Sequence, residues 1–169
     1  MLAAKFDDLT ECGGDAEEWE YYVLESFLVL RRTKIKDRQG NIRFERWGIE
    51  TPLFNIYIHH FLYPDKDGHP HDHPWSFLTF ILCGAYLEWT KKGLFWRKRG
   101  TFKFNPASEP HQVVATRAKN GVWTLVFTGP TKRIWGYHLK YPRDGSYAVD
   151  SWIPNDHYRN LKNAGQLPK

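Results

Sequence analysis

Cysteine is scarce in this sequence. The 169 residues contain only two, Cys12 and Cys83, which lie far apart in the chain. Two isolated thiols make no disulfide framework, so nothing here requires an oxidising compartment. Cys83 lies inside the apolar run F-L-T-F-I-L-C-G-A-Y-L, and we expect it to be a small buried side chain.

Long hydrophobic stretches and a leader pattern are also missing. The longest apolar run, residues 77–87, is much shorter than the ~20 residues of a transmembrane helix. The amino terminus has no basic region followed by an apolar segment, so no signal peptide is expected. We therefore predict a cytoplasmic protein that has no membrane segment.

Nucleic-acid-binding motifs are absent, although the chain is basic. The net charge is +5, and much of it lies in K-K-G-L-F-W-R-K-R-G, residues 91–100. No helix-turn-helix, RNP or zinc-finger pattern accompanies this run. A solvated hairpin whose charges discourage edge pairing is the favoured interpretation, and nucleic-acid binding through 91–100 is the alternative.

Aromatic residues are abundant, at 17% of the chain with eight tryptophans. Aromatic side chains favour strands, and many short alternating segments follow residue 30, separated by turn sequences such as D-R-Q-G-N and K-K-G. No repeat, linker or low-complexity segment divides residues 1–169. The pattern predicts one all-β domain, a sandwich or barrel.

One helix is predicted near the amino terminus. Asp15 and Glu18 form a capping-box pattern. The apolar residues that follow recur at helical spacing: Trp19, Tyr22, Val23, Phe27 and Leu30. The tail after Pro154 is polar, and we expect it to run over the surface.

The stretch G-H-P-H-D-H-P-W, residues 68–75, carries the chemistry. Side chains two positions apart on a strand share a face, so His71 and His73 project together as two ligands of one ion would. His111, at the entrance of another predicted strand, is the candidate third ligand. His69 shares their parity, but its place beside Pro70 favours a loop.

These residues resemble the two motifs of the cupin family. The first motif is matched by His71, His73 and Gly84, with Phe77 in the position of an acidic residue and Asp65 in that of the leading glycine. The second is matched by Gly100, Pro106 and His111, with Ser108 replacing a glycine. The resemblance covers about residues 50–140. H-D-H-P-W is similar to an uncharacterised bacterial and phage cupin group, which supplies no reaction.

The resemblance implies a double-stranded β-helix, a jelly-roll barrel, with one divalent transition metal inside. His71, His73 and His111 would be its ligands, with iron the first choice and zinc, nickel, manganese or copper the alternatives. Because Phe77 replaces an acidic ligand, the full charge of the ion would face the pocket and attract a small anionic substrate. Dimers are common among cupins, so the resemblance also makes a homodimer an expectation to test.

The preceding predicted strand, F-N-I-Y-I-H-H-F, contains two further histidines with opposite facings. Either His59 or His60 could point inward; we favour His59, because Asn55, Tyr57 and His59 would form a polar inner row. The predicted substrate pocket comprises Tyr57, His59, Phe77 and Tyr86. His138 and His157 are expected to be structural or exposed.

The resulting functional prediction is a metal-dependent cupin enzyme. Similarity to three-histidine thiol dioxygenases of this fold favours a non-haem Fe(II) dioxygenase, whereas a zinc hydrolase or isomerase is the alternative enzyme. A non-catalytic cupin that binds small molecules or nucleic acid is the alternative outside enzymology. The sequence assigns no catalytic residue.

Overall fold

A computed structural model describes residues 16–23, 27–37, 39–65, 69–143 and 146–167 of the chain. Within them the elements, in chain order, are β1 (Ala16–Val23), β2 (Leu28–Lys36), β3 (Ile42–Glu50), β4 (Asn55–Phe61), β5 (Phe77–Cys83), β6 (Ala85–Thr90), β7 (Gly93–Lys98), β8 (Phe102–Asn105), β9 (His111–Thr116), β10 (Val122–Thr128), β11 (Gly136–Arg143), β12 (Ser146–Pro154) and α1 (Asn155–Asn163).

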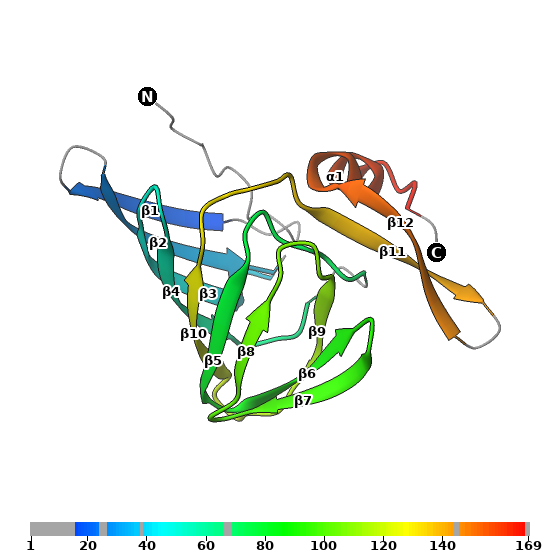
Figure 1. Cartoon of the computed structure of the whole chain (residues 1–169), viewed down its shortest axis with the longest axis horizontal. Coiled ribbons are helices and arrows are strands. Elements are labelled where there is room, and N and C mark those ends of the chain that lie inside the picture. Colours follow the sequence, from blue (N-terminus) through cyan, green and yellow to red (C-terminus); the bar gives the residue numbers. More distant parts are fainter. Residues whose placement is uncertain (1–15, 24–26, 38, 66–68, 144–145, 168–169) are drawn as a thin grey trace.

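The strands form three antiparallel sheets (Figure 1). The largest has the order β1-β2-β3-β4-β10-β5-β8, the second β7-β6-β9, and the third is the β11-β12 hairpin. The first two sheets share a core, because Ile81 and Val122 of the large sheet pack with Tyr86 and Val113 of the second. The fold is therefore all-β, a jelly roll of the cupin type, as predicted.

Alternation along the strands defines a buried face of each sheet. On β10, Val122, Thr124 and Val126 are buried, and the residues between them are more exposed. The opposite face of the large sheet is also partly apolar, with Ile58 and Phe127 each 40% exposed. A homodimer stays a prediction.

The predicted amino-terminal helix is wrong. Residues 16–23 form β1, which pairs in antiparallel register with β2, and β2 begins at Leu28; Asp15 lies outside the described residues. Aromatic and β-branched residues serve strands well, and pairing with a neighbouring strand overrides a weak capping pattern.

The described helix lies instead at the other end of the chain, where a polar surface tail was expected. α1 follows Pro154, has Asp156 in its first turn and Lys162 in its last, and buries Tyr158 against Tyr137 of β11. Among the described residues, no helix has the length and apolar character needed to span a bilayer.

Two further predictions concern Cys83 and the basic segment 91–100. Cys83 is exposed rather than buried, because it ends β5 where the sheet opens toward the turn at Gly84; Cys12 lies outside the described residues. The basic segment 91–100 comprises the turn of the β6-β7 hairpin, strand β7 and the turn that follows it, and most of it is exposed. The Arg97 side chain is partly buried, and its Nε lies 2.8 Å from Glu88 Oε2.

Candidate metal centre

His71 and His73 lie on the extended segment that leads into β5. The backbone of His71 pairs with that of His111 through two hydrogen bonds of 2.9 Å, and His73 N–H donates to Ala107 O at 3.0 Å. Alternation along an extended chain places the His71 and His73 side chains on one side of this segment. The backbone pairing also brings His111, at the start of β9, directly opposite His71.

Asp72 points the other way and anchors the segment to the carboxyl-terminal hairpin. Its carboxylate is 1% exposed and accepts hydrogen bonds from Gly136 N–H at 2.7 Å and Trp152 Nε1 at 2.9 Å. Arg133 forms an ion pair with it. Burial acts to raise the pKa of Asp72, but the hydrogen bonds from His138, Arg133 and Gly136 outweigh it and lower the pKa.

The imidazole of His111 is oriented by Glu88 of β6. His111 Nδ1 lies 2.9 Å from Glu88 Oε1. A carboxylate can only accept, so Nδ1 carries the proton and Nε2 presents its lone pair. A carboxylate behind a histidine is the usual way in which a protein fixes the tautomer and direction of a metal ligand.

Glu88 is itself held by two cations. Its side chain is 1% exposed, Lys103 Nζ lies 2.6 Å from Oε1, and Arg97 Nε lies 2.8 Å from Oε2. Burial acts to raise the pKa of Glu88, but the hydrogen bonds and charges of His111 and Lys103 outweigh it and lower the pKa to about 2. Glu88 is therefore a fixed negative charge at any physiological pH.

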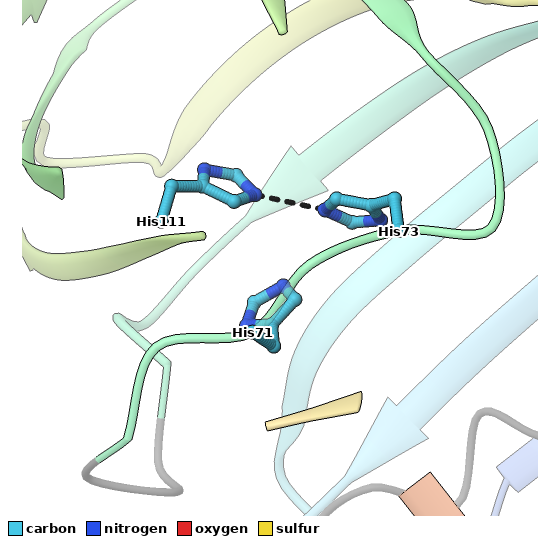
Figure 2. Close-up of side chains that lie close together, drawn as sticks. All are labelled: His71, His73 and His111. Atoms are coloured by element: carbon cyan, nitrogen blue, oxygen red, sulfur yellow. Dashed lines mark hydrogen bonds between the residues drawn. The ribbon is translucent and has the colours of Figure 1, made fainter. Parts of the chain in front are cut away.

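The three imidazoles converge (Figure 2). His73 Nε2 lies 2.8 Å from His111 Nε2, and one ligand nitrogen from each of His71, His73 and His111 lies within 4.8 Å of the other two. Burial, together with the neighbouring His71 and His111, lowers the pKa of His73 well below its usual value. Burial likewise lowers the pKa of His111, so both His73 and His111 favour the neutral imidazole that binds metals.

This donor set suits a divalent transition metal. Metal–imidazole bonds are ~2.0–2.1 Å long, so one ion can reach three nitrogens this close together after small ring rotations. Within the described residues, the cluster contains histidines alone and no carboxylate. Three imidazole ligands leave further coordination positions for substrate, water or O₂, and fit iron, zinc, nickel or copper.

Aromatic rings surround the cluster. Phe77, which opens β5, lies edge-on to His73 with ring centroids 4.7 Å apart and is 5.8 Å from His111. The ring centroids of Trp75 and His73 are 5.2 Å apart, and those of Trp135 and His71 are 6.2 Å apart. Phe77 therefore faces the histidines.

The other predicted pocket residues separate into two groups. Tyr57 packs with Phe77 in one core cluster, and the His59 ring lies 5.7 Å from that of Tyr57. Tyr86 belongs to a different cluster, with Ile81, Val113 and Val122. The structure therefore brings Tyr57, His59 and Phe77 together but not Tyr86.

The remaining histidines lie outside the cluster. The ring centroids of His69 and Tyr158 of α1 are 6.0 Å apart, and His138 Nε2 lies 3.4 Å from Asp72 Oδ2. His60 lies on the face of β4 opposite His59 and stacks on Trp123, with ring centroids 4.1 Å apart. His157 is exposed on α1.

Two functional residues, Glu88 and Asp72, were not predicted from the sequence. A signal existed for each. Asp72 alternates with the two histidines and so must face away from them, and Glu88 shares strand parity with Tyr86 in A-Y-L-E-W, where an acidic residue on an apolar face is unusual. The partner of each depends on pairing between distant segments.

His59 gives the protein a defined acid sensitivity. Burial, with a contribution from Arg46, lowers the pKa of His59 to about 3, whereas the unfolded chain protonates it at ~6.5. Below pH ~6.5 the unfolded state therefore binds more protons than the folded state, and stability decreases as the pH is lowered from there to about 3. We expect the free energy of unfolding of the metal-free protein, measured with urea, to decrease between pH 7 and pH 5. The decrease should be about 2 kcal/mol smaller in His59→Gln than in wild type. Equal losses in both proteins would contradict this, and His157→Gln is the control.

No protein-family model and no curated protein matches the chain. Solved structures resemble it weakly. A protein provisionally assigned as a mannose-6-phosphate isomerase from Ralstonia eutropha is 15% identical, with 48% of this chain and 79% of that chain covered and a TM-score of 0.45. KdgF from Halomonas sp. is 16% identical, with 52% and 79% covered and a TM-score of 0.42.

The iron(II) form of HppE is 11% identical, with 68% of this chain and 56% of that chain covered and a TM-score of 0.44. The match thus spans little more than half of the HppE chain. Similarity at this level assigns neither a family nor an activity to this chain.

Proposed function

We propose that this protein is a metal-dependent cupin enzyme in which His71, His73 and His111 hold one divalent transition metal. We further propose a non-haem Fe(II) dioxygenase that acts on a small anionic substrate and places both atoms of O₂ in the product, so that no separate reductant is consumed. The observation that carries the proposal is the convergence of three imidazoles, with His111 oriented by a buried carboxylate. A bound Fe(II) ion would supply adjacent positions for substrate and O₂.

The surroundings favour oxygen chemistry over zinc hydrolysis. Activation of water benefits from a nearby general base. Glu88 contacts His111, and Asp72 lies between His71 and His73 in the chain; both carboxylates are saturated by cations or N–H donors. The rings of Trp75, Phe77 and Trp135 line the cluster with apolar surface.

Metal analysis and O₂ uptake test the proposal. The purified protein should contain about one transition metal per chain, and metal-free protein reloaded anaerobically with Fe(II) should consume O₂ when small thiol or hydroxy carboxylates are added. Reloading with Zn(II) should give no O₂ uptake. Hydrolysis or isomerisation by the zinc form, without O₂ uptake by the iron form, would instead favour the alternative enzyme.

A substitution at position 77 tests whether the three histidines leave coordination positions on the ion for an anion. Because the Phe77 ring lies 4.7 Å from that of His73, a carboxylate introduced by Phe77→Glu should reach the ion and compete with anions. Metal affinity should hold or rise while affinity for acetate and phosphate falls, measured from the absorption spectrum of the cobalt-substituted protein.

Phe77→Leu is the matched control, because it removes the ring without adding charge. If the new carboxylate cannot reach the ion, its unpaired burial should destabilise the fold by several kcal/mol, on the order of 3. Equal anion affinity in two equally stable proteins would show that position 77 does not face the metal.

A further inference from the structure

Three polar side chains form a row across the buried face of the large sheet. Arg46 of β3 lies directly opposite His59 of β4, and His59 lies directly opposite Thr124 of β10. Residues paired in this way project to the same face, with Cβ atoms ~4.5–5.5 Å apart. We call Arg46, His59 and Thr124 the Arg46 row.

Each member of the Arg46 row has a buried polar atom without a hydrogen-bond partner in the described part of the chain: Arg46 Nε, His59 Nε2 and Thr124 Oγ1. Thr124 is 0% exposed and Arg46 is 7% exposed. Buried polar atoms in folded proteins are nearly always paired. Three unpaired ones on adjacent strands therefore point to a ligand rather than to chance.

The charge of Arg46 is also uncompensated. Its Nη2 donates to Thr33 Oγ1 at 3.4 Å, and its guanidinium lies 4.7 Å above the Tyr57 ring, but among the described residues no carboxylate forms an ion pair with it. Glu50, on the same strand, instead pairs with Arg31 at 3.0 Å and accepts a hydrogen bond from Tyr57 at 2.9 Å.

This arrangement costs stability unless something binds it. An unpaired buried charge strongly destabilises a fold, and a cation–π contact offsets only part of that cost. The guanidinium fork matches the geometry of a carboxylate or phosphate. Thr124 and His59 add a hydroxyl and an imidazole, both of which can donate to the same oxygens.

We propose that the Arg46 row is an oxyanion subsite that binds the carboxylate or phosphate of the substrate, while the reacting end of the substrate lies at the three histidines. The second half of this statement rests on the proposed function. The first half does not, because the Arg46 row contains no metal ligand and should bind an oxyanion in metal-free protein.

The subsite adjoins the histidine cluster. The His59 ring lies 5.7 Å from the Tyr57 ring, Tyr57 packs with Phe77, and the centroids of the Phe77 and His73 rings are 4.7 Å apart. The Tyr57 ring is in turn seated over Gly48, where an added Cβ would lie 2.4 Å from Tyr57 Cδ1. Gly48 thus leaves room for the ring on which Arg46 stacks.

Calorimetric titration of metal-free protein with inorganic phosphate, and separately with acetate, tests the subsite. Wild type should bind at least one of the two, and Arg46→Met should weaken that binding by about tenfold to a hundredfold. Arg43→Met is the matched control, because it removes the same charge from the opposite face of β3, where Arg43 Nη2 donates to Pro64 O. The anion that binds more tightly identifies the substrate group.

Stability separates a binding role from a structural one. If the charge of Arg46 is held for a ligand, Arg46→Met should leave the thermal midpoint of the ligand-free protein unchanged or raise it, and the midpoint should no longer respond to the anion. A lower midpoint in Arg46→Met, together with no anion binding by wild type, would overturn the proposal.

Thr124→Val keeps the test usable if Arg46→Met does not fold, because it replaces a hydroxyl by a methyl group of similar size. It should weaken anion binding about threefold to tenfold, and unchanged binding would count against the subsite. Anion binding that requires metal and is insensitive to Arg46→Met would place the anion at the ion, which overturns the subsite but leaves the proposed function. The converse result, an Arg46-dependent anion site in a protein that takes up no metal, would leave only the subsite.

Discussion

Replacing His111 with alanine should abolish metal binding. His71 and His73 come from one short segment, and only His111, across the His71–His111 backbone pair, completes a three-nitrogen site. It is also the ligand whose Nε2 is aimed by Glu88. Two imidazoles bind a divalent ion weakly, so occupancy in the purified protein should fall from about one metal per chain to a few per cent, at most one-tenth.

Elemental analysis of the purified variant measures this loss, and calorimetry with zinc confirms it on metal-free protein. His157→Ala is the control, because His157 is exposed on α1. Full occupancy in His111→Ala would contradict the assignment of all three ligands. His69 would be the first residue to re-examine, although its ring packs against Tyr158.

The fold class was predictable from the sequence because it depends on local patterns. Alternation, turn sequences and aromatic content predict an antiparallel β protein, and the large sheet and the β6-β7 hairpin follow that pattern. Residues 16–23 show the limit of such patterns. Spacing alone there is compatible with a helix, and only pairing with β2 decides for a strand.

Only the features of the site that depend on spacing along the chain could be predicted from the sequence. Parity gives the shared direction of His71 and His73, and motif spacing adds His111. The orientation of His111 depends on the register between β6 and β9, in which Thr90 lies opposite His111 and Glu88 opposite Val113. The Arg46 row likewise exists only through the register of three strands. Register between distant strands cannot be read from one sequence.

Glu88→Gln should have the largest effect on stability. The substitution keeps the shape of the side chain but removes a buried negative charge that contacts Lys103 at 2.6 Å and Arg97 at 2.8 Å. Both cations then lack their counter-ion, and breaking a buried ion pair in this way costs about 3–5 kcal/mol. The free energy of unfolding, measured with urea at pH 7 on metal-free protein, should fall by that amount. Glu45→Gln, which breaks the more peripheral pair with Arg32 at 3.3 Å, should cost about 1 kcal/mol or less.

The second effect of Glu88→Gln concerns the metal. An amide cannot hold the proton of His111 Nδ1 as a carboxylate does, so metal affinity should fall about tenfold to a hundredfold. Adding Lys103→Met removes one stranded cation, so the double variant should regain part of the lost stability but none of the metal affinity. That split separates the two roles of Glu88. If Lys103→Met restored both quantities together, the metal loss would follow from general unfolding rather than from the His111–Glu88 hydrogen bond, and Glu88 would have no specific role in orienting the ligand.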